Sequence, residues 1–199
     1  MDTLSKDELL KTSGLKVGNC IFDKKIDDIR LNIENLSWVK SAVVKRILPS
    51  NYEIHIIERV PVAYWQNKDQ LFLVDETGTV LPTTAVKSFP SLPISVGENA
   101  PSAIPEFLEL LKKFPLIGQQ LVFCTYLGNR RWDIQISRGL LIKLPENGVD
   151  DALKLVQRMG SKDGYFSDDV SVIDLRIQNR AIISKKKVKK KTEIRSNEM

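Results

Sequence analysis

The sequence contains few of the residues that membrane spans and metal sites require. Its 199 residues include one histidine, His55, and two cysteines, Cys20 and Cys124. A structural zinc site takes a tetrahedral set of histidine and cysteine ligands, so these side chains predict no metal site. No stretch approaches about eighteen consecutive apolar residues, and residues 1–13 lack the basic start and apolar core of a signal peptide. We expect a chain that is either cytoplasmic or anchored by a segment upstream of this sequence.

Catalytic motifs are also missing. There is no Gly-x-Ser-x-Gly sequence, no phosphate-binding P-loop and no Gly-x-Gly-x-x-Gly fingerprint. His55 lies between isoleucines in a predicted strand, a position that favours a structural or surface role over that of a catalytic base. The acid pairs Asp27-Asp28, Asp150-Asp151 and Asp168-Asp169 fit helix faces, helix starts and loops better than an acid–base couple. The sequence thus predicts no catalytic residue and no cofactor, and we do not expect an enzyme.

The positive charge is confined to the end of the chain. The formal net charge is +5, and residues 185–199 account for it with seven basic and two acidic side chains, so residues 1–184 net zero. Blocks of like charge are usually solvated and disordered, and we expect this of the tail. The alternative is a weak attraction to anionic lipid or nucleic acid. A folded nucleic-acid-binding surface would show its excess in the body of the chain, so we predict no nucleic-acid partner.

Residues 1–60 show the pattern of a small unit of helices and strands. Ser5 and Glu8 form a capping-box pattern for a helix that Gly14 ends. Asp23 is placed to cap a second helix, in which apolar residues recur at spacings of three and four. These residues are Ile26, Ile29, Ile33 and Leu36. Two strands are expected next, over 38–47 and 52–58.

Residues 61–184 are predicted to form a second, mostly β domain. Pro61 restricts the residue before it to an extended conformation, and we place the domain boundary there. The expected strands cover 62–66, 70–75, 79–81, 92–96, 120–127, 132–137, 140–144 and two pieces of 170–184 that are broken at 178–180, and the expected helices cover 103–114 and 149–160. Segregated helices and mainly antiparallel strands are typical of the α+β class.

Three segments in a fixed order resemble the FtsQ/DivIB family of bacterial cell-division proteins. The first is residues 36–65, LSWVKSAVVKRILPSNYEIHIIERVPVAYW, which resembles the family pattern of a Leu-Pro-Trp-Val start and a Glu-Arg-x-Pro-Val-Ala-x-Trp exit, with Ser37 in place of proline. The second is Val74–Gly78, similar to the family's Val-Asp-x-x-Gly, and the third is Ile173–Arg176, similar to its Ile-Asp-Leu-Arg. Together the resemblance covers residues 21–184.

The resemblance implies a fold, a location and partners. Residues 1–60 would be a POTRA domain, a β-α-α-β-β module whose first strand is largely missing here. Residues 61–184 would be the family's β-domain, a curved, mostly antiparallel sheet with two helices. Family members are held by one transmembrane helix, expected upstream of this sequence, so the domains would lie on the periplasmic side of the bacterial inner membrane. The implied role is a non-catalytic scaffold that binds FtsB and FtsL, contacts FtsK, FtsW, FtsI and FtsN, and links early and late division proteins.

We expect the partners to bind at the last strand. An exposed edge strand offers unpaired N–H and C=O groups beside which an incoming strand adds. The expected edge comprises Ile177, Asn179, Arg180, Ala181, Ile182, Ile183 and Ser184. Exposed isoleucines there would give a partner apolar contact; the alternative, that they pack inward, is equally compatible with the residues alone. The resemblance favours binding, and it adds the arginine pair Arg130 and Arg131 to the partner surface.

One further reading belongs to another class of protein. POTRA domains also occur in assembly or transport factors, and the first block alone suits such a factor. Factors of that class usually repeat the POTRA module, and the sequence shows no internal repeat.

Overall fold

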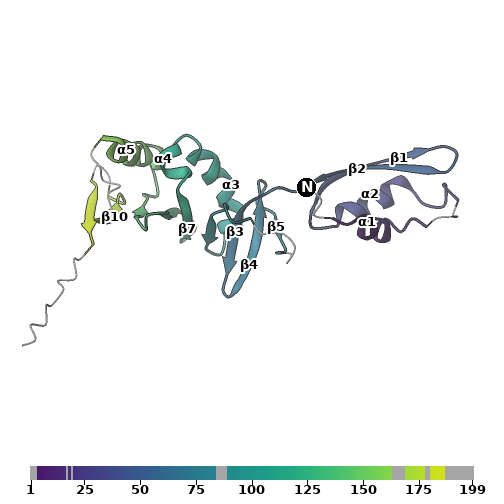
Figure 1. Cartoon of the computed structure of the whole chain (residues 1–199), viewed down its shortest axis with the longest axis horizontal. Coiled ribbons are helices and arrows are strands. Elements are labelled where there is room, and N and C mark those ends of the chain that lie inside the picture. Colours follow the sequence, from purple (N-terminus) through teal and green to yellow (C-terminus); the bar gives the residue numbers. More distant parts are fainter. Residues whose placement is uncertain are drawn as a thin grey trace, which may run out of the picture. The chain divides into compact units, whose positions relative to one another are not determined.

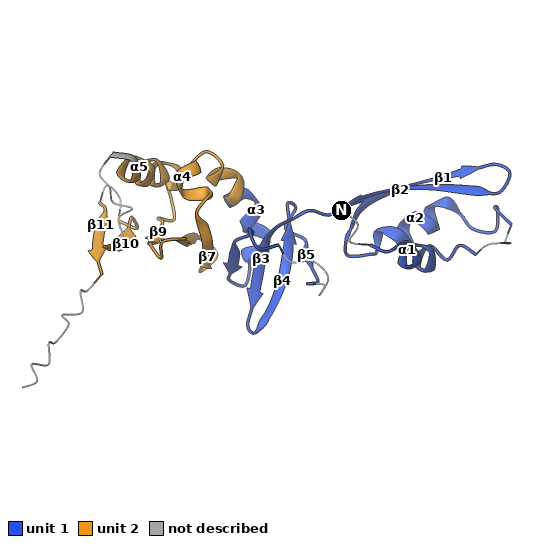
Figure 2. Cartoon of the chain, viewed as in Figure 1, with its two compact units in different colours: residues 1–107 blue, residues 108–199 orange. Residues whose placement is uncertain are grey.

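The computed structural model describes residues 4–16, 18, 20–83, 89–162, 169–177 and 180–186 (Figure 1). The chain divides into two compact units, residues 1–107 and 108–199 (Figure 2). The elements are α1 (Lys6–Ser13), α2 (Ile26–Glu34), β1 (Val39–Ile47), β2 (Asn51–Glu58), β3 (Pro61–Asn67), β4 (Gln70–Asp75), β5 (Val80–Leu81), β6 (Ile94–Val96), α3 (Ala100–Leu111), α4 (Pro115–Gly118), β7 (Leu121–Leu127), β8 (Arg131–Ile136), β9 (Leu141–Lys143), α5 (Val149–Lys162), β10 (Val170–Asp174) and β11 (Ile182–Lys185). The predicted α+β class is confirmed.

Helix α1 begins and ends where its capping residues predict. The Ser5 hydroxyl accepts a hydrogen bond from the backbone N–H of Glu8 at 3.1 Å, which satisfies one of the free donors of the first turn. Gly14 closes the helix in the left-handed conformation, at a φ of 64°, and donates its N–H to the Lys11 carbonyl. Both ends were predicted from the sequence and are confirmed.

The N-cap of helix α2 lies two residues later than predicted. The N-cap residue is Lys25, which makes no side-chain capping bond, so the assignment of Asp23 as cap is wrong. The Asp23 carboxylate instead accepts from the Cys20 N–H at 3.1 Å and holds the turn before the helix. The predicted apolar face is correct, because Ile29 and Ile33 are fully buried.

Strands β1 and β2 form an antiparallel hairpin with one covered and one open face. Ala42 lies opposite Ile56 and Val44 opposite Ile54, and these side chains pack into the core of the first unit. On the other face Ile57 is 60% exposed, because successive side chains of a strand point to opposite faces. The described residues before α1 contain no strand, and the sheet of this part of the chain is two-stranded.

The remaining strands of the first unit are ordered β6-β3-β4-β5. β3 lies between β4, its antiparallel partner, and β6, its parallel partner. The Trp65 indole N–H donates to the Gly97 carbonyl at 2.8 Å and fixes the end of β6 beside β3. Buried side chains of these strands and of the hairpin region form one apolar cluster, which includes Trp38, Val39, Leu73 and Leu81.

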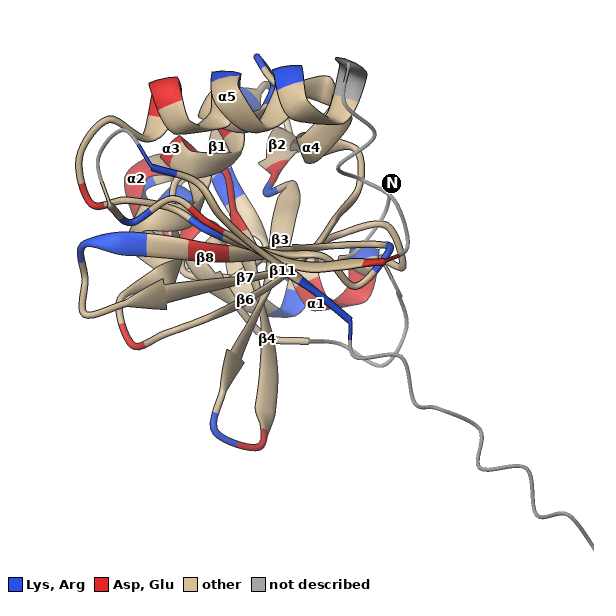
Figure 3. Ribbon diagram, turned by 90° about the vertical axis from the view of Figure 1, so that its left-hand side faces the viewer, with Lys and Arg blue, Asp and Glu red and all other residues tan. Residues whose placement is uncertain are grey.

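The second unit is a sheet in the order β11-β10-β9-β8-β7. Its pairs are antiparallel except β9 with β10, which run parallel. Helix α5 lies over one face of this sheet (Figure 3). The short helix α4, which begins with Pro115, was not predicted. Within the described ranges no helix combines the length and the apolar character that crossing a membrane demands. The boundary near residue 61 and the disordered tail stay predictions, and residues 187–199 lie outside the described residues.

Candidate protein-binding edge

Strand β11 lies at one edge of the sheet of the second unit. It pairs antiparallel with β10, and among the described strands it has no neighbour on its other side. The outer side of an edge strand is the side on which an added strand pairs with the backbone N–H and C=O groups. The Ser171 hydroxyl donates to the Ser184 carbonyl at 3.0 Å, and Lys186 donates its N–H to the Asp169 carbonyl, so the strand is fixed to β10 along its length.

A row of isoleucines crosses the sheet on the face that α5 covers. Ile134 lies opposite Ile142, Ile142 opposite Ile173, and Ile173 opposite Ile183. The first three are completely buried, as are Leu153 and Val156 of α5. Ile183 ends the row on the edge strand and is half-buried. The apolar face of this unit thus runs out to the edge, where a neighbouring strand would extend it.

A charged row crosses the same strands on the other face. Asp133 of β8 lies opposite Lys143 of β9, and Lys143 lies opposite Asp174 of β10. Asp174 in turn lies opposite Ile182. Carboxylates therefore alternate with a cation across the sheet, and the row ends on an aliphatic side chain that is 50% exposed. Side chains of opposed residues project to the same face, so Ile182 and Ile183 face opposite sides of the sheet.

Arg176 holds the Asp174 carboxylate. Its Nε donates to both carboxylate oxygens, at 2.9 and 3.0 Å, and its Nη2 donates to Oδ2 at 2.6 Å. The backbone N–H of Arg176 also donates to Oδ1 at 3.1 Å. The hydrogen bonds from Arg176 keep the pKa of Asp174 below its ordinary value, although partial burial opposes them. Asp174 is therefore ionised at neutral pH, and it lies beside the edge strand.

Asp133 differs from Asp174 at the far end of the same row. Burial raises the pKa of Asp133 above its ordinary value, and the positive charges of Arg131, Lys143 and Arg176 offset this only in part. Its Oδ1 and the Nε of Arg131 are buried and have no hydrogen-bond partner among the described protein atoms. Ionised Asp133 is therefore less well stabilised by its surroundings than Asp174.

The structure brings most of the predicted site residues to this edge. Ile177 is 52% exposed, Ile182 is 50% exposed, and Arg180, Ala181 and Ser184 are exposed as well. Ile183 is half-buried, and Asn179 lies outside the described residues. The predicted isoleucines thus divide into two exposed side chains, Ile177 and Ile182, and one, Ile183, that continues the buried row.

The two predicted arginines lie elsewhere on the sheet. Arg131 begins β8, which is separated from β11 by β9 and β10, a distance of roughly 14 Å at the usual strand spacing. Arg130 is exposed and its Nε lies 3.7 Å from the Glu146 carboxylate, whereas Arg131 is half-buried. The arginine pair therefore does not lie at the edge itself. Arg131 belongs to β8, the strand on which the charged row begins with Asp133.

A groove borders the edge on the α5 side. It has a volume of about 500 Å³, and its lining includes Glu146, Gly148, Leu155, Leu175, Ile177 and Arg180. Ile177 and Arg180 were predicted as site residues, but the contributions of Leu155 and Leu175 were missed, as were those of Asp174 and Arg176. The family-like motif Ile173–Arg176 contains both Asp174 and Arg176 and is the sequence signal for them.

The histidine and the two cysteines lie on different segments of the chain. His55 is exposed on the open face of the hairpin, with its Nε2 3.0 Å from the Glu53 carboxylate. Cys20 is exposed and Cys124 is buried, and burial raises the pKa of the Cys124 thiol to about 12. Within the described part of the chain, no group of three or more histidine, cysteine or acidic residues has a metal-binding arrangement.

Comparison with known proteins gives matches over both parts of the chain. The FtsQ-type POTRA domain model matches residues 1–59, and the model of the C-terminal part of cell division protein FtsQ/DivIB matches residues 63–176. Cell division protein FtsQ of Rickettsia bellii (strain RML369-C) is 35% identical over 89% of this chain and 66% of that protein. FtsQ of Rickettsia typhi (strain ATCC VR-144 / Wilmington) is 34% identical over 90% of this chain and 68% of that protein.

More distant matches carry the same names. Cell division protein FtsQ of Bradyrhizobium diazoefficiens is 30% identical over 90% of this chain and 53% of that protein. The solved major extracytoplasmic domain of the cell-division protein DivIB from Geobacillus stearothermophilus is 19% identical, with a TM-score of 0.39 over 54% of this chain and 97% of that chain. The chain thus spans between about half and two thirds of the length of these FtsQ relatives.

Proposed function

The chain belongs to the FtsQ/DivIB family of bacterial cell-division proteins, and on that premise we propose that it is a non-catalytic scaffold that binds FtsB and FtsL at the β11 edge. A strand of the partner would add beside β11, whose outer side has no neighbour among the described strands. The observation that carries this proposal is the position of Ile182, an aliphatic side chain half exposed on an open edge strand.

Both faces of the edge suit an added strand. On the covered face, Ile183 would gain an apolar neighbour that extends the isoleucine row. On the other face, Ile182 would contact the partner beside the Asp174–Arg176 ion pair. The groove lined by Leu155, Leu175 and Ile177 would receive a further apolar side chain close by. Main-chain pairing would supply affinity, and these side-chain contacts would supply selectivity.

The wider role rests on the family alone. Residues 1–60 would serve as the POTRA domain and residues 61–184 as the β-domain. As in the family, these domains would lie on the periplasmic side of the inner membrane and would be held there by an anchor helix. Further contacts with FtsK, FtsW, FtsI and FtsN would let the scaffold connect early and late division proteins. Arg130 and Arg131 would border the partner surface at the far end of the charged row.

Isothermal titration calorimetry of residues 1–199 with the periplasmic segments of FtsB and FtsL from the same organism tests the proposal. We expect saturable binding that falls at least about tenfold in Ile182→Asp, because a charge would replace the apolar contact. Ile57→Asp is the matched control, since Ile57 is also an exposed strand isoleucine, 60% exposed, but belongs to the hairpin of the other unit. Wild-type affinity in a folded Ile182→Asp variant, or no binding by the folded wild type, would contradict the proposal.

A further inference from the structure

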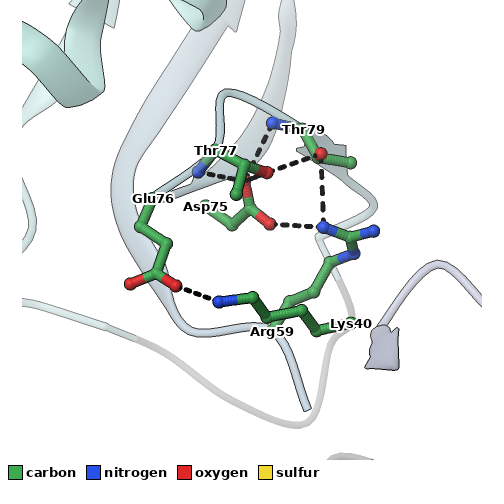
Figure 4. Close-up of polar contacts among 6 residues, drawn as sticks. All are labelled: Lys40, Arg59, Asp75, Glu76, Thr77 and Thr79. Carbon is green, nitrogen blue, oxygen red and sulfur yellow. Dashed lines mark hydrogen bonds and ion pairs between the residues drawn. The ribbon is translucent and has the colours of Figure 1, made fainter. Parts of the chain in front are cut away.

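Arg59 connects the hairpin to the turn that follows β4. It comes directly after the last residue of β2, and its Nη1 donates to Asp75 Oδ2 at 2.7 Å and to Thr79 Oγ1 at 3.3 Å (Figure 4). Asp75 is the last residue of β4, and its side chain is 1% exposed. Burying a carboxylate costs free energy of folding unless the group is paired and hydrogen-bonded. Separating the two segments would leave the Asp75 carboxylate without its cation, so the contact holds the end of the hairpin against the turn.

The other oxygen of Asp75 is satisfied by its own turn. Oδ1 accepts from the Thr77 N–H at 2.9 Å, the Thr77 hydroxyl at 2.7 Å and the Thr79 N–H at 2.9 Å. Burial by itself would raise the pKa of Asp75, but the hydrogen bonds from Thr77, Arg59 and Thr79 outweigh it and hold the pKa below its ordinary value. The carboxylate is therefore ionised at neutral pH, and the turn is built around it.

Two more contacts lie close by: the first continues the β1–β2 pairing within the hairpin, and the second joins the hairpin to the turn. The backbone N–H of Arg59 donates to the Trp38 carbonyl at 2.9 Å, next to the start of β1. Lys40 on β1 forms an ion pair with Glu76 in the turn (Figure 4). Apolar side chains join the hairpin to the following strands as well. Trp38 and Val39 belong to the same buried cluster as Leu73 of β4 and Leu81 of β5.

These contacts argue against free movement at the boundary between the two family domains. Domains of one chain normally move relative to one another unless a large apolar interface holds them. Here Val60 is 65% exposed, but the strand that follows it is held in the core from its first residue, because Pro61 is buried and Ala63 is completely buried. A charged network and a shared apolar cluster both cross the boundary near residue 60.

We propose that the contacts of Trp38, Lys40, Arg59, Asp75, Glu76, Thr77 and Thr79, which we call the Arg59–Asp75 joint, couple the β1–β2 hairpin to strands β3–β5 as one cooperative folding unit. A partner that binds and stabilises either part then stabilises the other to the same extent, since the two parts open together. This coupling goes beyond the proposed binding role and does not depend on the β11 edge.

Hydrogen exchange followed by mass spectrometry on the whole chain tests the coupling. Asp75→Asn removes the charge that Arg59 binds, and we expect amide protection in β1–β2 and in β3–β5 to fall by the same factor, about ten- to hundredfold. Asp69→Asn, the same change at an exposed residue between β3 and β4, is the control and is expected to leave both sets of amides unchanged. A loss confined to β3–β5, with full protection of the hairpin, would overturn the proposal.

A milder variant decides the question if Asp75→Asn does not fold. Thr79→Val removes the hydroxyl that accepts from Arg59 but keeps the backbone N–H that Asp75 requires. We expect a smaller loss of protection that is again equal in the two segments. Unequal loss in this variant, with the hairpin amides at wild-type protection, would overturn the coupling in the same way.

Discussion

Ile182 on β11 lies directly opposite Asp174 on β10, on the charged face of the sheet. Asp174 is already bound by Arg176, so Ile182 stands beside a neutralised ion pair rather than a bare carboxylate. An incoming strand would therefore meet an aliphatic side chain at the end of a charged row, which favours a partner with an apolar residue at the matching position. The next residue, Ile183, offers its contact on the opposite face.

The buried Ile173 of β10 and the exposed Ile182 of β11 should differ in how much stability is lost when each side chain is truncated. Ile173→Ala removes a fully buried side chain from the isoleucine row, and we expect the free energy of unfolding to fall by about 2–5 kcal/mol. Ile182→Ala removes one that is 50% exposed, and its effect on stability should stay within about 0.5 kcal/mol. Urea unfolding of both variants measures this. A large loss of stability in Ile182→Ala would show that its role is packing within the chain.

Gly78 permits a turn that other residues would strain. Its φ is +83°, and a Cβ atom built on it would lie 2.9 Å from the Pro101 carbonyl oxygen. We expect Gly78→Ala to lower the free energy of unfolding by about 1–3 kcal/mol through backbone strain and this close contact. The control is Gly139→Ala, at a φ of +77° with no atom within 4 Å of the added Cβ. Thermal or urea unfolding that gave both variants equal losses would rule out the Pro101 contact as a contributor.

Local signals in the sequence predicted much of the fold because they act over a few residues. The capping pair Ser5 and Glu8 and the stop at Gly14 are satisfied within one short segment, so they need no tertiary information. The alternation of Ile56 and Ile57 in β2 likewise follows from the pleat of a single strand. The cap of α2 was missed because Asp23 has a competing acceptor role toward Cys20, which its position alone does not reveal.

The candidate site was only partly predictable because it depends on strand order and register. The segment from Ile177 to Ser184 was identified as an edge, but which isoleucine faces outward follows from pairing with β10. Arg130 and Arg131 were grouped with that edge, whereas two strands separate them from β11. The contact between Arg59 and Asp75 joins residues sixteen positions apart, and no local pattern indicates that the carboxylate is buried.

Asp174 and Asp133 lie in one charged row but should respond oppositely to pH. The pKa of Asp174 is lowered in the folded chain from an ordinary value of 3.8, so its stabilising contribution is present above that value and is lost as the pH falls through the folded pKa. The pKa of Asp133 is raised from the same ordinary value. Its ionisation therefore costs stability as the pH rises from 3.8 through the folded pKa.

Replacing each carboxylate by its amide isolates these opposite contributions. Asp174→Asn should destabilise the chain at pH 7, and its deficit against the wild type should shrink as the pH falls below 3.8. Asp133→Asn should gain stability relative to the wild type as the pH rises above 3.8, because the amide removes a partly buried charge. Urea unfolding of the wild type and both variants between pH 3 and pH 7 gives the two curves. Parallel curves would mean that the row titrates as exposed carboxylates do, and that neither Arg176 nor burial distinguishes its two ends.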